Sequence, residues 1–507
     1  MEVSLFIKRH PWVVGLATSA ALGCTFVVES DIKGSGLGTV CAANDQCHAG
    51  VCDNGICVAS CTVDGECPSP TKCFAGKCQT PLKVAGLWIG PVTEGEGWNS
   101  THQEGMEEAA KQLPYLNWYR RENVLPFTGD VDKMVDQAVL EEKVDVVVLN
   151  SFSQREEMMK KAEQYKHVKF LNCSGDNFNG HNAISYDGHI EQSWWVAGRV
   201  AASKAKKRLG FVASFITPEV VRYISAFYLG ARSVNKDIKV EVQWLGFWVD
   251  YKTPESYPYK GPLSDNQDVK LYREDLLTYR LIDSGAEVIA HSTDSQRPVR
   301  AIERLTKDGK IHDVYSISND NKAGCVDLLT KQRMQSCLGS PYWNWTPLYI
   351  QMFEDIHRGT WRADQNRNEV MIIDPAKSVP GFELNPASGI DSNAVRSYVT
   401  EISSRGWEHT FAGPYETTGQ RDRDLDGLAD AVQAFGADEK MSETEYNTMC
   451  WFPKGVIEKF DVTDPKSADV DGRVPDEDRV RDTKFVNDLE GPPGVPPGVG
   501  IVCKKNL

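Results

Sequence analysis

Six short apolar runs, separated by amphipathic stretches, constrain the fold of the main part of this 507-residue chain. Continuous apolar runs of this length are typical of strands that are buried on both faces, as in a parallel sheet. The stretches between them carry apolar residues at three- and four-residue spacing, which predicts helices. The strict alternation of strands and helices predicts βαβ units with helices on both faces of each sheet. The apolar runs are residues 83–90, 144–150, 168–174, 208–214, 287–293 and 313–318, and amphipathic examples are 102–113, 130–142, 155–165 and 218–235.

The series breaks near Ser203, where the basic stretch 203–210 predicts a surface crossing, and a second series begins at Leu209. We therefore expect an α/β fold of two doubly wound three-layer lobes with a hinge, and a ligand cleft at the carboxyl ends of the strands. The expected first lobe is 82–206 plus about 318–345, and the second is 207–317 plus about 346–400. Residues 401–460 are expected to form a C-terminal hairpin and closing segment, and the acidic, Pro/Gly-rich residues 461–507 an extended tail.

The first 24 residues predict an export signal. A basic start at Lys8 and Arg9 precedes an apolar run, 11–22, that is too short to span a bilayer. The ending Ala-Leu-Gly-Cys24 resembles a bacterial lipobox, in which Cys24 becomes the lipid-bearing first residue of the mature protein. The alternative is an ordinary secretion signal with an unmodified cysteine. We expect an exported protein, periplasmic or at the cell surface, that is anchored to the membrane as a lipoprotein.

Cysteine usage agrees with export, because eight of the 14 cysteines fall within residues 25–80 in two imperfect repeats of about 20 residues. A module this small buries little apolar surface and contains no C-x2-C knuckle, so four disulfides are favoured over a zinc site. The pairing among the eight does not follow from sequence. Cys325 with Cys337 and Cys450 with Cys503 are further candidate pairs, and Cys173 is expected to be a buried free thiol. The eight are Cys41, Cys47, Cys52, Cys57, Cys61, Cys67, Cys73 and Cys78.

The composition and the missing motifs exclude several classes of function. A formal net charge of -15 disfavours nucleic-acid polymers as partners, because an acidic surface repels a phosphate backbone. The chain has no GxxxxGK[ST] phosphate loop, no HExxH and no GxSxG elbow. We therefore expect a binding protein rather than an enzyme, with no catalytic residues.

Several segments between Lys83 and about Glu458 resemble the basic membrane protein family of ABC-transporter substrate-binding lipoproteins. They include Gly97-Trp98-Asn99 with His102, Asn150-Ser151-Phe152 after a strand, and the run 214–235. Further segments are 286–298, 315–322 with Asp320, the YWNW turn at 342–345, FAGPY at 411–415 and 449–458. The resemblance implies a fold like that of type I periplasmic binding proteins.

The resemblance also implies reversible capture of a purine base or nucleoside for delivery to an ABC permease. Nucleoside-binding members tend to have a lysine near the position of Trp343, and that lysine contacts the ribose. A tryptophan there can cover a flat ring instead, which favours a free base such as adenine. The alternative is a cell-surface receptor or scaffold lipoprotein of the same fold, because the cysteine module and the tail are additions that a transport component does not need.

A purine ligand requires flat apolar faces and a few polar groups at fixed positions. The aromatic candidates Trp98, Phe152, Phe215 and Trp343 follow strands or open helices, although core packing is the ordinary role of any single aromatic residue. Asp294 and Asp320 follow buried strands and could accept from a ring amine, or could cap the next helix. Asn99 and His102 could orient the base or satisfy loop backbone, and His291 is expected to pack at a strand end.

No cofactor is expected apart from a candidate structural calcium ion. The segment DRDLDGLAD places oxygen ligands at alternate positions and glycine at the sixth, like the start of an EF-hand loop. Its ligands would be Asp422, Asp424, Asp426 and Asp430. Position twelve is Gln433 instead of the usual glutamate, and Asp-Gly is also a common hairpin turn.

Overall fold

The computed structural model describes residues 41–459 apart from 48–49, 54, 93–96, 175–176, 215–216, 246–247, 249–256, 364–369, 372–379, 418–433, 438, 443–444, 447–448 and 450. The expected signal peptide with Cys24, the Cys450–Cys503 pair and the tail 461–507 lie outside these residues. The protein divides into two units, within which residues contact one another far more than between them: Met1–Gln79 and Thr80–Leu507. Among the described residues, no helix combines the length and apolar character that crossing a bilayer requires.

The described residues of the first unit, from Cys41 onward, form two copies of one small motif. Each copy has a single 3-10 turn followed by a two-stranded antiparallel hairpin: η1 Asn44–Gln46 with β1 Val51–Asp53 and β2 Ile56–Val58, then η2 Asp64–Glu66 with β3 Lys72–Phe74 and β4 Lys77–Gln79. The expected four disulfides are confirmed, and each copy joins its first cysteine to its third and its second to its fourth. The pairs are Cys41–Cys52, Cys47–Cys57, Cys61–Cys73 and Cys67–Cys78.

The two copies are held together by polar contacts around Asp53. Its carboxylate accepts from Lys77 Nζ and from Gln79 Nε2, each at 2.6 Å. The backbone N–H of Cys78 also donates to the carbonyl of Ala59 at 2.8 Å. The copies therefore form one disulfide-rich module.

The second unit contains a six-stranded parallel sheet in the order β17-β9-β8-β7-β5-β6. Helices α2 (Asp130–Leu140) and α3 (Arg155–Gln164) cover one face, where Val135 and Met158 pack on Val147 and Leu149. The strand neighbours Val146 and Val148 point to the other face and are equally buried, so both faces are covered. The strands are β5 Leu82–Leu87, β6 Leu116–Arg121, β7 Val146–Leu149, β8 Lys169–Cys173, β9 Ala183–Gly188 and β17 Val370–Met371.

A seven-stranded sheet in the order β18-β16-β15-β14-β10-β11-β21 forms the second lobe, and all pairs are parallel except β16–β18. Helices α6 (Arg273–Asp283) and α7 (Arg297–Lys307) pack on one face around Ile289. Helices α4 (Glu191–Ala202) and α5 (Pro218–Val234) cover the other, where Trp194 and Phe227 contact Phe211. The strands are β10 Arg208–Ala213, β11 Lys239–Trp244, β14 Val288–His291, β15 Tyr315–Ile317, β16 Cys337–Tyr342, β18 Gly381–Leu384 and β21 Val456–Lys459.

In both sheets the first five strands of the series have the spatial order 2-1-3-4-5, which is that of a doubly wound fold. The expected α/β fold with two doubly wound lobes is therefore confirmed. The smaller elements attached to the second sheet are the hairpin β12 Tyr257–Tyr259 and β13 Val269–Leu271, the turns η4 Pro262–Ser264, η5 Pro386–Ser388 and η6 Trp407–Phe411, helix α9 Ser392–Ser404, and the pair β19 Tyr415–Glu416 and β20 Ala434–Phe435. The expected Cys325–Cys337 disulfide is present, and Cys173 is buried and free.

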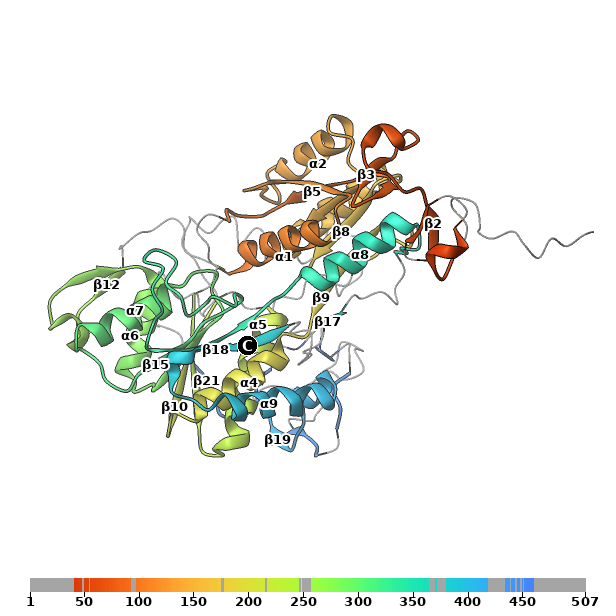
Figure 1. Cartoon of the computed structure of the whole chain (residues 1–507). Helices are drawn as coiled ribbons and strands as arrows, with labels where there is room; N and C mark the ends of the chain where they lie inside the picture. Colours follow the sequence, from red (N-terminus) through yellow and green to blue (C-terminus); the bar gives the residue numbers. More distant parts are fainter. Residues whose placement is uncertain are drawn as a thin grey trace, which may run out of the picture. The chain divides into compact units, whose positions relative to one another are not determined.

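The structure corrects the expected crossing segments between the lobes. The chain leaves the first sheet after β9, because α4 packs on α5 and β16 of the second lobe, some 15 residues before the crossing expected near 203–210. β16 pairs with β15, so residues 318–345 do not belong to the first lobe. The chain returns with α8 (Thr346–Arg358), which packs on α1 (Trp98–Gln112), and with β17 beside β9. Figure 1 shows α8 next to α1, although the two helices are far apart in the sequence.

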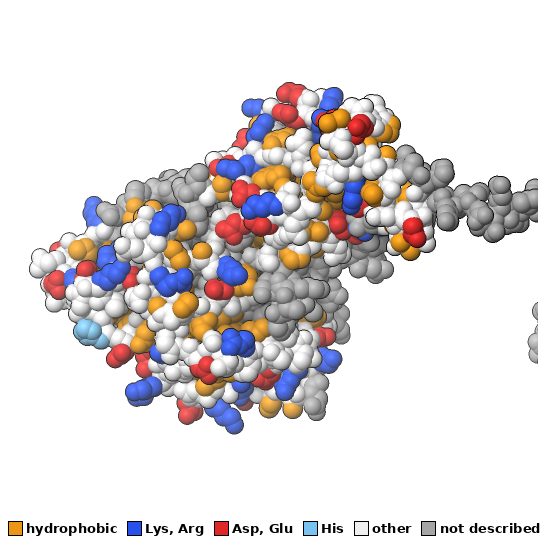
Figure 2. Space-filling model, in the orientation of Figure 1, with side chains coloured by type: hydrophobic (Ala, Val, Ile, Leu, Met, Phe, Trp, Pro, Cys, Tyr) orange, Lys and Arg blue, Asp and Glu red, His pale blue; other side chains and the backbone are white. Residues whose placement is uncertain are grey.

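The surface charge is mixed in sign. On the face drawn in Figure 2, acidic and basic side chains of the described residues are interspersed over both lobes. The acidic composition is therefore not gathered into a single area among the residues visible on that face.

The packing of α4 on α5 depends on two glycines. A Cβ atom at Gly198 would lie 2.0 Å from the carbonyl oxygen of Phe227, and one at Gly230 would lie 2.0 Å from that of Trp195. Because both neighbours are backbone atoms, they cannot rotate away. These glycines allow the two helices to approach backbone to backbone.

We predict that Gly198→Ala destabilises the second unit by roughly 1–3 kcal/mol or more, since the added methyl group forces the helices apart. Urea unfolding measures the change. Gly436→Ala is the matched control, because a Cβ there meets its nearest neighbour at an ordinary 3.6 Å. Equal unfolding midpoints for the two variants would show that the helices can separate without cost.

Candidate functional site

The strand order of each sheet reverses between two neighbouring strands, β5 and β7 in the first and β10 and β14 in the second. In open α/β sheets, ligands bind outside the carboxyl ends of the strands at this switch point. In the first lobe, Asn150 follows β7, and its Oδ1 accepts from Ile89 N–H at 2.9 Å. Its Nδ2 donates to Asn99 Oδ1 at 2.8 Å, and Asn99 also accepts from Gly90 N–H at 3.3 Å. Asn99 therefore fixes the start of α1 to the strand ends.

The second lobe presents a matching set of polar groups. Ser214 after β10 and Ser292 after β14 join their hydroxyls at 3.0 Å. His291 is buried, its Nδ1 lies 3.0 Å from Thr293 Oγ1, and burial lowers its pKa to about 4, so it is neutral near pH 7. His291 packs at its strand end, as expected. Asp294 follows in the same loop, and its N–H donates to Trp248 O at 2.8 Å.

The start of α1 meets the second lobe at Gly97. This residue has φ +62°, and a Cβ there would lie 3.6 Å from Asp294 O and 3.6 Å from Asp320 Oδ2. Ser100 Oγ in the next turn accepts from Asn321 Nδ2 at 3.0 Å. The two lobes are thus in contact at the carboxyl ends of their strands, and the candidate residues of both are brought together there.

Three indole rings lie at this junction. Trp343 stacks on Trp345 with centroids 4.6 Å apart and planes 14° from parallel. Trp98 meets both edge-on, at 6.2 Å from Trp343 and 5.8 Å from Trp345. Its Nε1 donates to the carbonyl of Asn150. Sequence reasoning selected Trp98 and Trp343, but it did not select Trp345, although the same YWNW turn carries it.

His102 lies behind these rings. It is fully buried, its ring stacks on Trp345 at 4.7 Å, and its Nδ1 is 2.6 Å from the hydroxyl of Tyr349. That hydroxyl is in turn 2.9 Å from the hydroxyl of Tyr186. Burial holds the pKa of His102 well below its ordinary value, so the ring is neutral. This position supports the indoles.

Phe152 opens the 3-10 turn η3 (Phe152–Gln154) after β7 and is half-buried. The guanidinium of Arg155 lies 3.7 Å from its ring centroid, and Arg155 Nη1 donates to Phe152 O at 3.0 Å. Arg155 thus covers one face of the ring. Phe215 and the calcium candidates Asp422, Asp424, Asp426 and Asp430 lie outside the described residues.

Asp320 is held in an unusual backbone conformation, with φ +57°. Its Oδ2 accepts from Asn319 Nδ2 at 2.9 Å, and its carbonyl accepts from Trp343 N–H at 3.0 Å. Burial raises the pKa of its carboxyl to about 8, and the negative charge of Glu219 acts in the same direction, while hydrogen bonds from Trp343 and Asn319 oppose the rise. Such a strained, buried carboxyl is typical of functional sites.

Two further carboxyl groups near Asp320 were missed by sequence reasoning. Burial raises the pKa of Asp187, at the end of β9, and Glu219 adds to the rise, whereas Arg222 opposes it. Burial also raises the pKa of Glu219, which accepts from Tyr223 Oη at 2.5 Å. The signal for Glu219 was its place at the first turn of a helix that follows a buried strand.

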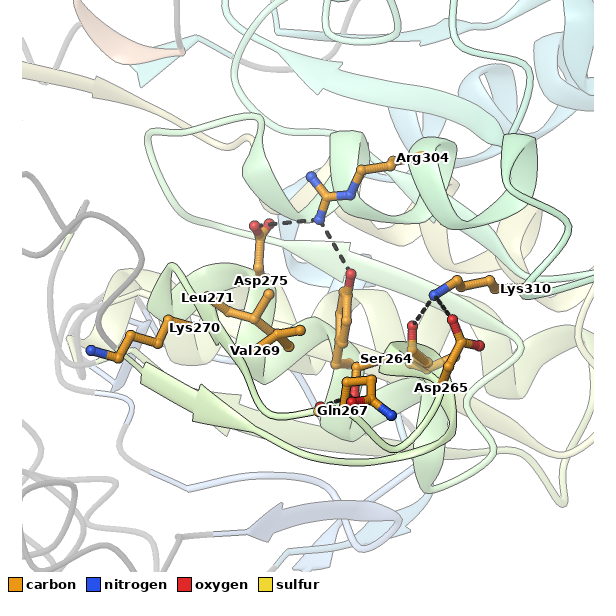
Figure 3. A pocket seen from close by; sticks show the side chains of 11 residues that line it. Ser264, Asp265, Gln267, Val269, Lys270, Leu271, Asp275, Arg304 and Lys310 are labelled. Carbon is orange, nitrogen blue, oxygen red and sulfur yellow. Dashed lines mark hydrogen bonds and ion pairs between the residues drawn. The ribbon is translucent and has the colours of Figure 1, made fainter.

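A separate cavity of about 440 Å³ opens on the second lobe between η4, β13, α6 and α7. Two of the three cations that line it are held by protein oxygens: Arg304 by Asp275 and the Tyr279 hydroxyl, and Lys310 by Asp265 and the carbonyl of Leu263 (Figure 3). None of the predicted ligand residues lines it.

Comparison with known proteins agrees with this geometry. Residues 82–260 match the sequence model of the Bmp family, described as ABC transporter substrate-binding protein PnrA-like. This stretch, about a third of the chain, is similar to the Bmp family.

Two curated relatives share about three fifths of the chain. One is a putative ABC transporter glucose-binding protein, TsgA13, of Haloferax volcanii, 29% identical over 304 residues that make up 60% of this chain and 66% of the relative. The other is a purine-binding protein of Brucella abortus, 27% identical over 298 residues, 57% of this chain and 73% of the relative. The match therefore leaves about a third of the first relative uncovered.

Among solved structures, an ABC transporter solute-binding protein of Conexibacter woesei aligns with a TM-score of 0.47 at 18% identity, over 64% of this chain and 95% of that one. One from Aeropyrum pernix aligns with a TM-score of 0.44 at 16% identity, over 65% and 90%. The fold assignment above is based on the strand order of this chain itself.

We predict that Asp320 makes stability depend on pH. Its pKa is raised from 3.8 to about 8, so the folded protein binds this proton more tightly than the unfolded chain does. Its contribution is fully present below its unfolded pKa and is lost as the pH rises through about 8. Between about pH 5 and pH 8, the free energy of unfolding of the wild type should fall with rising pH more steeply than that of Asp320→Asn. The difference in slope should be roughly 1 kcal/mol per pH unit.

Urea unfolding at several pH values measures this slope. Asparagine tolerates the left-handed backbone, so the variant adds little strain of its own. The control is Asp308→Asn, which removes an exposed carboxylate from the same lobe and should run parallel to wild type. Parallel curves for Asp320→Asn and wild type would show that the carboxyl is already ionised in the folded protein.

Proposed function

We propose that the chain is an extracytoplasmic solute-binding protein that captures a small purine-type ligand between its two lobes, with a free base such as adenine favoured over a nucleoside. The observation that carries the proposal is the convergence of Trp98 from one lobe with Asp320 and Trp343 from the other at the strand ends. The match of residues 82–260 to a substrate-binding family and the similarity to a purine-binding protein support it. The proposed binding residues are Trp98, Asn99, His102, Phe152, Phe215, Asp294, Asp320 and Trp343. Of these, Asn99 and His102 act by positioning their neighbours.

The indoles supply the flat apolar surface that a purine needs. Stacking of a base on an aromatic side chain contributes roughly 1–3 kcal/mol, so Trp98 and Trp343 would provide much of the affinity. Trp343 stands near the place where nucleoside-binding relatives tend to have a lysine for the ribose. An indole cannot replace that cation, and this difference favours the base.

The carboxyl groups select for N–H donors. Asp320 can accept from an exocyclic amine or a ring N–H, and a charge-assisted bond is about twice as strong as a neutral one. Glu219 acts on Asp320, and Asp187, Glu219 and Asp320 all act on Cys173. A phosphorylated ligand would add negative charge beside these buried carboxyl groups and oppose their ionisation, so nucleotides are disfavoured.

Capture would proceed by closure of the lobes about the crossing segments between β9 and α4 and between β16 and α8. The proposed partners are an ABC permease that recognises the closed form and the membrane, through a lipid on Cys24. No catalytic step is proposed.

A second candidate function is a cell-surface receptor or scaffold of the same fold. It is favoured by the two-copy disulfide module, which forms a unit of its own ahead of the binding unit. A neighbouring gene pair for a permease and an ATPase would support transport, whereas an isolated gene would support the receptor.

We predict that adenine or another free purine base raises the melting temperature of the chain without residues 1–24 by a few degrees, since a ligand at 100 times its Kd adds about 2.7 kcal/mol. The panel comprises adenine, guanine, hypoxanthine, their nucleosides, AMP and glucose. A shift with glucose alone would overturn the purine assignment. A shift with nucleosides but not bases would overturn the argument from Trp343.

We further predict that Trp343→Leu weakens binding of the active base by about 10- to 100-fold, because one stacking face is lost. Titration calorimetry measures the Kd. Trp361→Leu is the matched control, because Trp361 is similarly buried but lies after the end of α8, where it contacts Lys169 at the start of β8. An unchanged Kd for Trp343→Leu would remove this residue from the site.

A further inference from the structure

The first crossing between the lobes is tied to the C-terminal segment of the chain. β9 ends at Gly188 in the first sheet, and α4 of the second lobe begins at Glu191. Between them, His189 stacks on Trp407 with centroids 4.7 Å apart and planes 4° from parallel. His189 Nδ1 is also 2.6 Å from Glu191 Oε1.

The second oxygen of Glu191 leads to the same segment. Glu191 is fully buried, and its Oε2 accepts from the hydroxyl of Tyr446 at 3.0 Å. Tyr446 packs edge-on against both His189 and Trp407, at 4.9 Å each. Two residues of the crossing and two from the C-terminal segment therefore form one closed set of contacts, which we call the brace: His189, Glu191, Trp407 and Tyr446.

The brace is anchored to the second lobe. The guanidinium of Arg222, on α5, lies 3.8 Å from the ring centroid of Tyr446, and its Nη1 donates to the Tyr446 carbonyl at 2.8 Å. The turn η6, which contains Trp407, also packs on α4 and α5. The crossing from His189 to the start of α4 is thus held to the second lobe, and its bend is left to the end of β9 at Gly188.

We infer that the brace is a positioning device for ligand capture: by fixing His189 and Glu191 to the second lobe, it confines the hinge motion to the end of β9 and narrows the range of lobe orientations in the ligand-free protein. A narrower range lowers the entropy that closure must remove, so the brace raises affinity without contacting the ligand. The effect on affinity rests on the proposed function, whereas the restriction of lobe motion does not.

The test uses Tyr446→Phe, which removes the hydroxyl bound to Glu191 and keeps the ring under Arg222, and Trp407→Leu, which removes the stack on His189. Spin labels at Glu141→Cys and Asp308→Cys, both exposed and one on each lobe, report the interlobe distance in the full chain without ligand. Both brace variants should broaden the distance distribution. With the base identified in the thermal-shift panel, they should raise Kd about 3- to 10-fold.

Tyr415→Phe is the matched control. It removes another buried tyrosine hydroxyl of the C-terminal segment, but one that donates to Phe411 O within that segment. Trp407→Phe retains a ring on His189 and should behave like wild type. Brace variants that lower the unfolding midpoint but leave the distance distribution unchanged would reduce the brace to a purely structural role and overturn the inference. If no purine binds, the proposed function fails, and the distance measurement in the ligand-free chain still decides on the brace.

Discussion

Parallel pairing of the first and third strands of each series, β5 with β7 and β10 with β14, is the constraint on which the rest of the structure depends. It directs the carboxyl ends of all central strands to one edge of each sheet and opens a switch point there. Asn150 and the Ser214–Ser292 pair occupy the two switch points and satisfy backbone groups that the ending strands leave free. The polar and aromatic residues that follow the strands can therefore meet across the lobes only at this edge.

Much of this arrangement follows from the sequence. A buried parallel strand reads as a continuous apolar run, so three strands of each sheet could be recognised. A residue that comes directly after such a run must lie at the carboxyl edge. Asp320 could be selected for this reason, whereas Trp98 and Trp343 were selected from segments that resemble a known family. The structure brings the three together. The disulfide module was recognisable for a different reason, since cysteine spacing repeated over two copies. Its pairing required the hairpins, which place the third cysteine of each copy opposite the fourth.

The crossing segments could not be predicted, because alternation of strand and helix does not say which of two sheets a strand joins. β16 has Gly, Ser and Pro in place of a continuous apolar run, so the sequence does not mark it as a strand of either sheet. Its pairing with β15 assigns it to the second lobe. The role of His102 was hidden for a similar reason. Its position one turn into α1 suggested a ligand contact, but α8 returns to the first lobe and places Tyr349 and Trp345 against it. Glu191 and Tyr446 lie 255 residues apart, and no local pattern links them.

The junction of the lobes contains interactions that favour contact between the lobes and a buried carboxyl group that opposes it. Stacked indoles and the Asn321–Ser100 hydrogen bond favour contact between the lobes, whereas burial of Asp320, with Glu219 near it, disfavours the ionised carboxyl. A closed site without ligand must therefore hold extra protons or bear uncompensated charge. Under the proposed function, a base with N–H donors satisfies these carboxyl groups, so the same residues that recognise the ligand make closure depend on it. The aromatic surface would supply affinity, and the cost of burying the acids would keep the empty protein open.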